Sequence, residues 1–548
     1  MPWILFRHFL AELTKVLLLT TVIIVVVVAF GAVIKPLTGN LLGPGGILKY
    51  IFLAMVPMLQ YALPFSAGFA ATIVTHRFAS DNEVQAMSVS GISYFVILLP
   101  QAFLGIVLTI FMFFLVQTAI PRFLGLMSDV ITNDAAQVFV STIRSGESFR
   151  AGNFMIFADR IAMDDSVTDP SMQRIRMEGV AAIEIDAAGK LGTEFVARSG
   201  SADLYTEQSD LIVKVAFRDA TILRPGESTV AFMSLVEPMP TLIDVGWERS
   251  PKYLPWSELL GVVGDPSKGA MVVIERMRLK KAIAPALAIE QLGAELAKSG
   301  SALLIGSESN RVYEIHDAIL GGNGLIPLPP AKRFTVIEFN GQKALREAST
   351  VSAGLTGTAN SDGATATSLL DLVLTEPRTR ALHGEADRVV RWPPRIVGLS
   401  PDIKLEKNSS TLSVKELMEA ARRIAAQTTP PLNAYASVAK GLIASIENKK
   451  SETFYEALSH VWMRFAQPMS VLFMLVLGGI LAIWRRHSLP LTIFLLAFVP
   501  AIANVLLIAS GQSILRSSKV GFGLTVMWLG NAVLLALILS IGRRMARR

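Results

Sequence analysis

Six long apolar stretches limit what this chain can fold into. They lie at about positions 13–34, 47–74, 92–120, 465–484, 489–509 and 522–542. About 20 apolar residues are enough to cross a bilayer as a helix. With 52% hydrophobic and 17% charged residues, the chain is too apolar for an ordinary soluble enzyme. We therefore expect six transmembrane helices, three at each end of the chain, around a large water-facing middle region.

The first stretch has a second interpretation. Its apolar run from Leu13 to Ile34 contains an unbroken core from Val22 to Phe30. A cleaved signal peptide has a core of roughly 7 to 15 apolar residues, and this run is longer. A transmembrane helix is therefore the favoured interpretation, with a signal peptide as the alternative.

The positive charges predict the orientation of the helices. Lys and Arg are enriched in short loops on the cytoplasmic side. With both termini in the cytoplasm, nine basic residues face that side: Arg7, Lys15, Arg77, Arg485, Arg486, Arg543, Arg544, Arg547 and Arg548. Four face the other side: Lys35, Lys49, Arg516 and Lys519. The bias places the termini in the cytoplasm and the middle region outside, which in a bacterium is the periplasm.

The middle region carries the alternation of β-strands. Leu211, Val213, Val215 and Phe217 occupy every second position, the pattern of a strand with two different faces. We place the N-terminal trio of helices in residues 1–122 and the C-terminal trio in 456–548. Two β units fill the space between them, at 123–281 and 282–455.

The division into two β units comes from an apparent internal repeat. Asp159 and Asp317 lie 158 positions apart in similar segments, and so do Glu258 and Glu416. Ser413 and Glu416 also form a capping box in front of a predicted helix. We infer a duplication. Chance similarity and a single enlarged β domain are the alternatives.

The sequence lacks the motifs of a soluble active site. Its histidines are scattered, so no metal-ligand set is expected, and it has no cysteine. The pair Gly189-Lys190 is followed by Leu191 and does not complete a P-loop. The basic residues flank the apolar stretches and form no stripe, so nucleic-acid binding is not expected. We expect no cofactor and no catalytic residue, and any ATP hydrolysis must occur in a separate subunit.

The loop between the second and third stretches, residues 76–91, carries the clearest polar motif. Ser80 and Glu83 have the spacing of a capping box, which predicts a short helix from 81 to about 89 that Gly91 ends. One face would point to the membrane or a partner: Val84, Met87 and Val89. The other would stay accessible: Asp81, Glu83 and Gln85. A cytosolic protein could grip such a helix, and a simple capped turn is the alternative.

At this loop the chain resembles the LptF/LptG family of lipopolysaccharide-export permeases. The resemblance includes Leu63-Pro64-Phe65 before the loop and Ile92-Ser93 after it. It extends to the stretch from His460 to Ile483 and to Trp528-Leu529-Gly530-Asn531. The most specific part is the loop itself.

The resemblance implies a function and a set of partners. Two such subunits, identical or sister chains, form a cavity that takes lipopolysaccharide or a related glycolipid from the inner membrane. A cytosolic ABC ATPase drives them, and a periplasmic β-jellyroll hands the lipid to bridge proteins toward the outer membrane. The middle region of this chain is larger than the family's usual domain, in line with the predicted duplication.

The resemblance also implies roles for individual residues. Glu83 matches the acidic residue with which the family's loop helix docks on the ATPase, and Arg77 matches the start of that loop. We expect Asp81, Val84 and Met87 to belong to the same coupling element, residues 80–91.

Two lysines and four prolines complete the candidate residues. Lys35 corresponds to a family lysine that contacts the anionic headgroup, and Lys49 is a weaker candidate for the same role. The alternative for Lys35 is an interfacial lysine that reaches toward water. The prolines are candidate hinges of a lateral gate, because they leave helix carbonyls unpaired: Pro57, Pro64, Pro100 and Pro468.

Two other classes of protein remain possible from the sequence. One is a mechanotransmission or lipoprotein-release type of ABC permease, in which the large domain follows the first helix. The other is a membrane-anchored periplasmic scaffold that transports nothing.

Overall fold

The computed structural model divides the chain into two compact units. Unit 1 comprises Met1–Pro266 with Glu452–Arg548, and unit 2 comprises Ser267–Ser451. The residues that the structure describes are 3–38, 43–127, 130, 148–151, 154–164, 172–185, 191–207, 210–223, 230–236, 241–242, 250–306, 311–341, 343–360, 367–381, 392–393, 395–401 and 412–546. Each unit has its own sheet and its own buried core.

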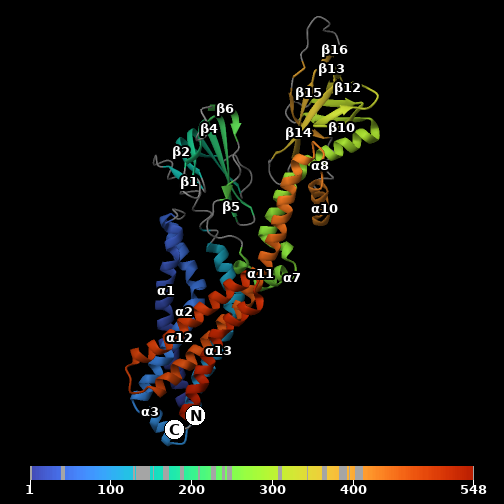
Figure 1. The fold of residues 1–548 in the computed structure, drawn as a ribbon. Coiled ribbons are helices and arrows are strands. Elements are labelled where there is room, and N and C mark those ends of the chain that lie inside the picture. The colour runs from blue at the N-terminus through green and yellow to red at the C-terminus, as the bar shows by residue number, and fades with distance from the viewer. Residues whose placement is uncertain are drawn as a thin grey trace. The chain divides into compact units, whose positions relative to one another are not determined.

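Unit 1 contains a bundle of long apolar helices (Figure 1). Its N-terminal helices are α1 (Trp3–Thr38), α2 (Pro44–Ser80), α3 (Glu83–Val89), α4 (Tyr94–Ile97), α5 (Leu99–Phe114) and the π-helical turn η1 (Leu115–Ala119). The later ones are η2 (Pro251–Tyr253), α7 (Trp256–Gly264), α12 (Pro490–Arg516) and α13 (Val520–Ala546). Helix α11 (Asn433–Trp484) begins in unit 2 and continues into unit 1 without a break.

Six helices of the described chain are long and apolar enough to cross a membrane. They cover Trp3–Ile34, Gly45–Ser80, Leu99–Met127, Asn433–Trp484, Pro490–Arg516 and Val520–Met545. The prediction of a membrane protein with a strand-rich region is confirmed. The third helix starts at Leu99 and not at Ile92, because the apolar residues before it form the short helix α4, which Ser93 caps.

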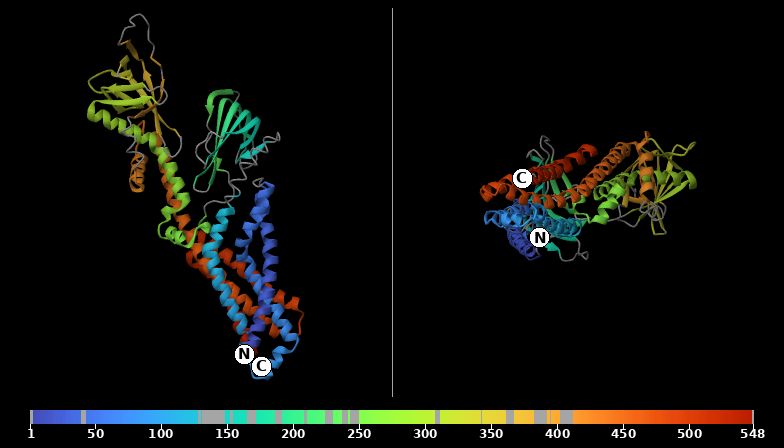
Figure 2. Two further views of the ribbon diagram at one scale, coloured as in Figure 1. Left: turned by 180° about the vertical axis from the view of Figure 1, so that it is seen from behind. Right: turned by 90° about the horizontal axis from the view of Figure 1, so that it is seen from below.

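The helices of the bundle pack in antiparallel pairs. Helix α1 lies beside α2, and α12 lies beside α13, as the two views in Figure 2 show. The α12–α13 pair is close because Gly511 and Gly523 have no side chains at their contact. Both chain ends lie at the end of the bundle that carries α3 (Figure 1).

The sheet of unit 1 is an antiparallel meander. Its strands are β1 (Phe149–Ala151), β2 (Phe154–Asp164), β3 (Met172–Ile185), β4 (Leu191–Glu207), β5 (Asp210–Leu223), β6 (Val230–Val236) and β7 (Thr241–Leu242). Strands β1 to β6 pair in sequence order, and β7 pairs with β5. In β3, Ile175 and Met177 are buried while Arg176 and Glu178 are exposed, as the alternation of a strand requires.

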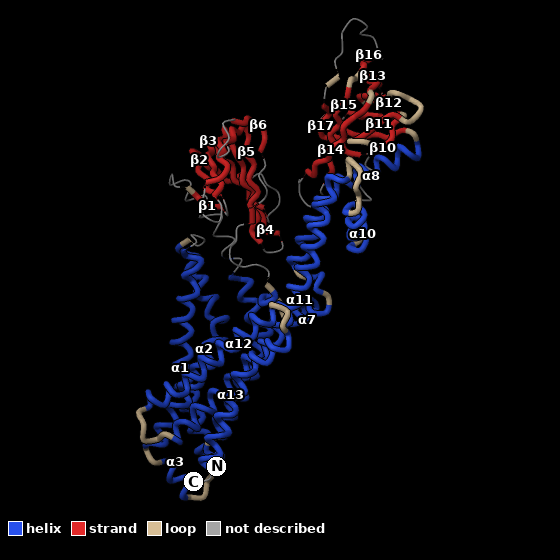
Figure 3. Tube along the Cα trace, in the orientation of Figure 1, coloured by secondary structure: helices blue, strands red, loops and turns tan. Residues whose placement is uncertain are grey.

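The sheet of unit 2 has another topology. Helices η3 (Pro266–Lys268) and α8 (Ala270–Ser299) precede it, and helix α10 (Val414–Ala425) follows it. Its strands are β8 (Ser301–Gly306), β9 (Arg311–His316), β10 (Ala318–Gly321), β11 (Gly324–Pro327), β12 (Phe334–Asn340), β13 (Lys343–Thr350), β14 (Ser352–Asn360), β15 (Thr367–Thr375), β16 (Arg378–Ala381) and β17 (Arg395–Pro401). Their order is β10-β11-β14-β15-β17-β8-β9-β12-β13-β16. Figure 3 shows the two groups of strands.

The strand orders contradict the expected duplication. The first sheet is a meander and the second has crossovers, so the two sheets are not copies of one topology. The landmarks also differ in place. Asp159 lies inside β2, whereas Asp317 lies between β9 and β10 with a φ of +56°. Alternating strands resemble one another locally, and this similarity suggested the repeat. The capping box of Ser413 and Glu416 is present and starts α10 as predicted. The jellyroll stays a prediction.

Candidate functional site

The candidate docking element is helix α3, which lies between the second and third spans. It runs from Glu83 to Val89 and follows a sharp turn at Asn82, whose φ is +61°. Gly91 ends it as predicted: its φ is +83°, and its N–H donates to the carbonyl of Ser88 at 3.0 Å. The helix is therefore short and held at both ends.

The predicted capping role of Ser80 is wrong. Helix α2 continues through Ser80, whose Oγ donates to the carbonyl of Arg77 at 2.9 Å. Because Ser80 is the last residue of α2, it is not the residue that directly precedes α3. Asn82 occupies that N-cap position. The sequence pattern located the helix but assigned its first residue to the wrong side of the turn.

One face of α3 is anchored in the bundle. Val84 and Met87 are buried, and they belong to the same core cluster as Phe9, Phe78 and Ile97. Both side chains are thus occupied by this chain's own helices. The sequence left two alternatives for this face, contact with the membrane region or with a partner protein. The structure buries Val84 and Met87 in the bundle of membrane helices.

The turn before α3 and the opposite face of the helix are exposed. Asp81 and Glu83 are exposed, and Val89 at the end of the helix is 89% exposed. Arg77 is also accessible, but its guanidinium pairs with Glu12 of α1 at 3.3 Å. A surface with two carboxylates and a free apolar side chain is therefore presented at the end of the bundle where both termini lie (Figure 1).

A second set of contacts ties α3 to the turn between α11 and α12. With its side-chain amide turned to match its neighbours, Gln85 accepts from Arg486 Nη2 at 3.0 Å and donates to Asn82 Oδ1 at 2.8 Å. His76 Nε2 donates to the carbonyl of Ser488 at 2.9 Å. These contacts could not be predicted from local sequence, because the paired residues lie more than 400 positions apart in the chain.

The lysines of the predicted headgroup site are placed only in part. Lys35 belongs to the last turn of α1, and its side chain lies outside the described residues. Lys49 is exposed in the second turn of α2. Their part in headgroup binding stays a prediction.

The candidate hinge prolines occupy two kinds of position. Pro57, Pro64 and Pro468 lie inside α2 and α11, where each removes a helical hydrogen bond. Pro100 lies in the first turn of α5, where the N–H has no helical partner in any case, so its interpretation as an internal hinge is wrong. At Pro64 the freed carbonyl of Gln60 accepts from Gln467 Nε2 at 3.1 Å.

The fold defines a multi-pass membrane protein with a strand-rich region, and the short helix α3 lies at one end of its helical bundle. A family model described as lipopolysaccharide export system permease LptF/LptG matches residues 3–237. Over this region, which is less than half of the chain, the protein is similar to LptF/LptG-type permeases. No curated protein matches the chain.

The similarity covers only the N-terminal part of the chain. It contains the first three spans, helix α3 and strands β1 to β6, and it ends before α7. The resemblance of residues 460–483 and 528–531 lies beyond it and stays a prediction. The matching model describes a permease, which is a transport protein. That this chain is not an enzyme stays an expectation.

Proposed function

We propose that the chain is the permease subunit of an ABC transporter that extracts lipopolysaccharide, or a related glycolipid, from the inner membrane. A separate cytosolic ATPase supplies the energy, and a second permease subunit, identical or a sister chain, completes the cavity. The lipid then passes to periplasmic bridge proteins. The observation that supports this most directly is the exposed acidic face of α3 within the region that the family model matches.

The proposed orientation places α3 and both termini in the cytoplasm and both sheets in the periplasm. The charge bias of the short loops supports it. The last turns of α13 add Arg543 and Arg544 at the end of the bundle that holds α3. An ATPase in the cytosol would therefore meet Glu83 directly.

The proposed coupling is mechanical. Val84 and Met87 fix α3 in the core of the N-terminal spans, and Gln85 links it to the α11–α12 turn. A rigid helix with these two attachments would pass a displacement by the ATPase to both ends of the chain. Glu83 is the proposed contact, with Asp81 and Arg77 beside it.

The test compares two full-length variants in native membranes. Glu83→Ala should abolish co-purification of the cytosolic ATPase or strongly impair coupled lipid release. Glu295→Ala changes another exposed helical glutamate, in α8 of unit 2, and should leave both unchanged. If Glu83→Ala retains normal ATPase binding and normal lipid release, Glu83 is not the coupling contact.

The runner-up, a mechanotransmission or lipoprotein-release permease, requires a third apolar stretch that does not span. Residues Leu99–Met127 are long and apolar enough to cross a membrane, which favours the export permease. Cysteine labelling from either side of the membrane would separate the two, because this chain has no cysteine of its own.

A further inference from the structure

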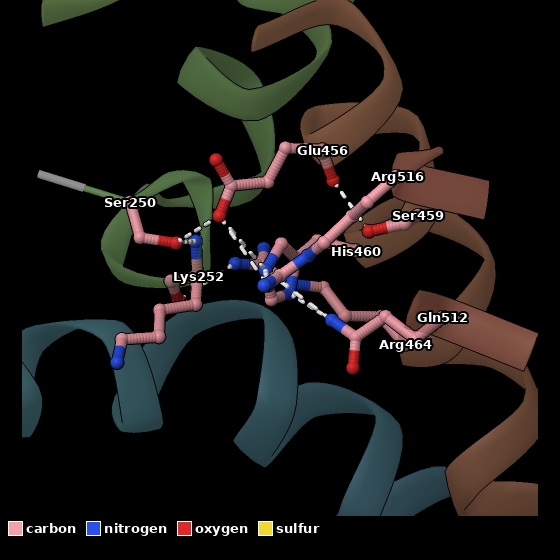
Figure 4. Close-up of polar contacts among 8 residues, drawn as sticks. All are labelled: Ser250, Lys252, Glu456, Ser459, His460, Arg464, Gln512 and Arg516. Carbon is pink, nitrogen blue, oxygen red and sulfur yellow. Dashed lines mark hydrogen bonds and ion pairs between the residues drawn. The ribbon is translucent and has the colours of Figure 1, made fainter. Parts of the chain in front are cut away.

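A partly buried polar cluster joins the membrane helices to the segment that follows the first sheet. Three residues of α11 contribute to it at helical spacing, Glu456, His460 and Arg464, and Figure 4 shows them facing the segment with Ser250 and Lys252. Gln512 and Arg516 reach the cluster from the end of α12. All of these residues belong to unit 1.

Arg464 is the centre of this cluster. Its side chain is buried, at 3% exposure, and its Nη2 donates to the carbonyls of Leu254 at 2.7 Å and Lys252 at 3.3 Å. Its Nη1 donates to Gln117 Oε1 at 3.3 Å. Among the described residues it has no carboxylate within ion-pair distance. The guanidinium therefore uses its charge to hold main-chain carbonyls.

The hydrogen-bond partners of Arg464 indicate a structural role for its charge. A buried charge is costly unless hydrogen bonds compensate it, and bonds from a charged donor are stronger than neutral ones. Two of the three bonds of Arg464 go to the backbone of the segment Ser250–Leu254, and the third goes to Gln117 in the π-helical turn of the third span. One side chain thus fastens three separate parts of the chain, and π-helical turns frequently mark functional positions.

A second group of bonds fastens the same segment. Ser250 Oγ donates to Glu456 Oε1 at 2.7 Å, and the same oxygen pairs with Arg516 Nη2 at 3.3 Å. Arg516 also donates to His460 Nε2 at 3.1 Å. The start of the segment is therefore held by α11 and α12 together.

Apolar contacts continue the attachment beyond the segment. Leu259 and Val262 of α7 are buried against Ala457 of α11. The ring of Trp256 meets Phe465 edge-on with 5.7 Å between centroids. Residues 250 to 264 therefore follow α11 along more than two helical turns.

We propose that Arg464 is the positioning residue of a joint that passes movements of the third, fourth and fifth spans to the segment 250–264. The joint is made of Ser250, Glu456, Arg464, Gln117 and Arg516. The segment follows the first sheet in the chain and leads to unit 2, so the joint is one place at which the membrane helices act on the chain outside them. The role of the joint in transport rests on the proposed function. That the joint exists is inferred from the hydrogen bonds described above, whatever the protein transports.

The first experiment uses Arg464→Met and a reversible crosslink. Arg464→Met removes the charged donor that bonds the carbonyls of Lys252 and Leu254. We expect lipid release per ATP hydrolysed to fall at least about tenfold in vesicles with fluorescent lipopolysaccharide. Because the chain is free of cysteine, Ser250→Cys and Glu456→Cys can be joined specifically by a short, reducible bifunctional methanethiosulfonate. In the Arg464→Met background, joining these positions should restore release, and reduction should abolish it again in the same sample.

The controls separate a joint from a folding defect. Ser250→Cys with Glu456→Cys beside native Arg464 is the reference, and Lys519→Met removes an exposed cation near the same end of the bundle and should have no effect. A folding defect would not switch on and off with reductant. Unchanged release in Arg464→Met, or a loss that the crosslink does not restore in normally assembled complex, would overturn the joint.

The second experiment does not depend on transport. Leu260 is an exposed residue of α7, and a spin label on Leu260→Cys reports the mobility of that helix. We expect Arg464→Met to increase the mobility of the label and Arg464→Lys to increase it less, because lysine keeps the charge but holds fewer carbonyls. Equal mobility in all three chains contradicts the joint. If the wild-type complex released no lipid, the proposed function would fail while this measurement would still decide on the joint.

Discussion

The side-chain amide of Gln467 donates to the carbonyl of Gln60 at 3.1 Å, and this is the carbonyl that Pro64 leaves without its helical partner. No water is available inside a bilayer to replace the missing bond. Gln467 of α11 therefore provides the hydrogen-bond donor for the Gln60 carbonyl that Pro64 of α2 lacks. Helix α2 is thus bonded to α11 at the position where Pro64 removes a hydrogen bond, so bending at Pro64 would also move α11.

Gln467→Leu should destabilise the bundle only when Pro64 is present. The variant leaves the Gln60 carbonyl unpaired, and hydrogen bonds between membrane helices are worth about 0.6 kcal/mol on average and up to about 1.7 kcal/mol. Pro64→Ala supplies an N–H to Gln60 and should make Gln467 dispensable. Unfolding of the four chains of this double-mutant cycle in mixed micelles measures the coupling. Additive effects of the two substitutions would show that Gln467 does not serve the proline.

The sequence located Pro64 but not its partner. A proline inside an apolar stretch predicts an unpaired carbonyl, and this much follows from the residue type alone. Which side chain meets that carbonyl depends on how α2 packs on α11, about 400 positions away, and no local pattern contains that information. The same reason hid the joint: Glu456, His460 and Arg464 have visible helical spacing, but Ser250 and Arg516 come from distant segments.

Val89→Asp should weaken binding of the cytosolic ATPase and leave the isolated permease stable. Val89 is almost fully exposed, whereas Val84 on the same helix is buried in the bundle core. Val84→Ala should instead lower the melting temperature of the permease, because it removes buried methyl groups at a cost of about 1 kcal/mol. Co-purification and thermal unfolding are measured for both variants. A loss of stability in Val89→Asp without the ATPase would place this residue in the core.

The spans and the short helix α3 were predictable because each depends on a local pattern. The lengths of the apolar stretches predicted the six long helices, and Gly91 predicted the end of α3. The start of α3 was not predictable from Ser80 and Glu83, because α2 extends beyond its apolar part into polar residues. The two sheets show the limit of periodicity: it identifies strands, but the strand order depends on contacts between distant segments.

Glu338 should stabilise unit 2 at neutral pH and lose this effect in acid. Its buried carboxylate accepts from Arg311 Nη1 at 2.6 Å and pairs with Arg346. Burial alone would raise the pKa of Glu338, but the hydrogen bonds from Arg346 and Arg311 outweigh it and hold the pKa below its usual value. The stability it contributes is therefore complete above the ordinary value of 4.5 and is lost as the pH falls through the lower pKa of the folded state.

Glu338→Gln tests this sign. At neutral pH we expect a loss of about 2 to 3 kcal/mol, less than for a fully buried pair because Arg311 is partly exposed. Modification of a cysteine at Ala348, a buried position of β13, follows unfolding in the full chain with and without the substitution. The difference between the two chains should shrink as the pH falls below 4.5. A difference that grows in acid would contradict the lowered pKa.

Gly511→Ala should separate α12 from α13. A methyl group at Gly511 would lie 2.5 Å from the main-chain nitrogen of Met527, and backbone cannot move aside as a flexible side chain can. The displacement would also strain the hydrogen bond from Asn504 to Asn531, now 3.2 Å, in the same helix pair. We expect a loss of about 1 to 3 kcal/mol, seen as a lower temperature of aggregation in detergent. Gly521→Ala is the matched control, because a methyl group there meets no atom within 4 Å. Equal stability of the two variants would mean that the helices are not in close contact at Gly511.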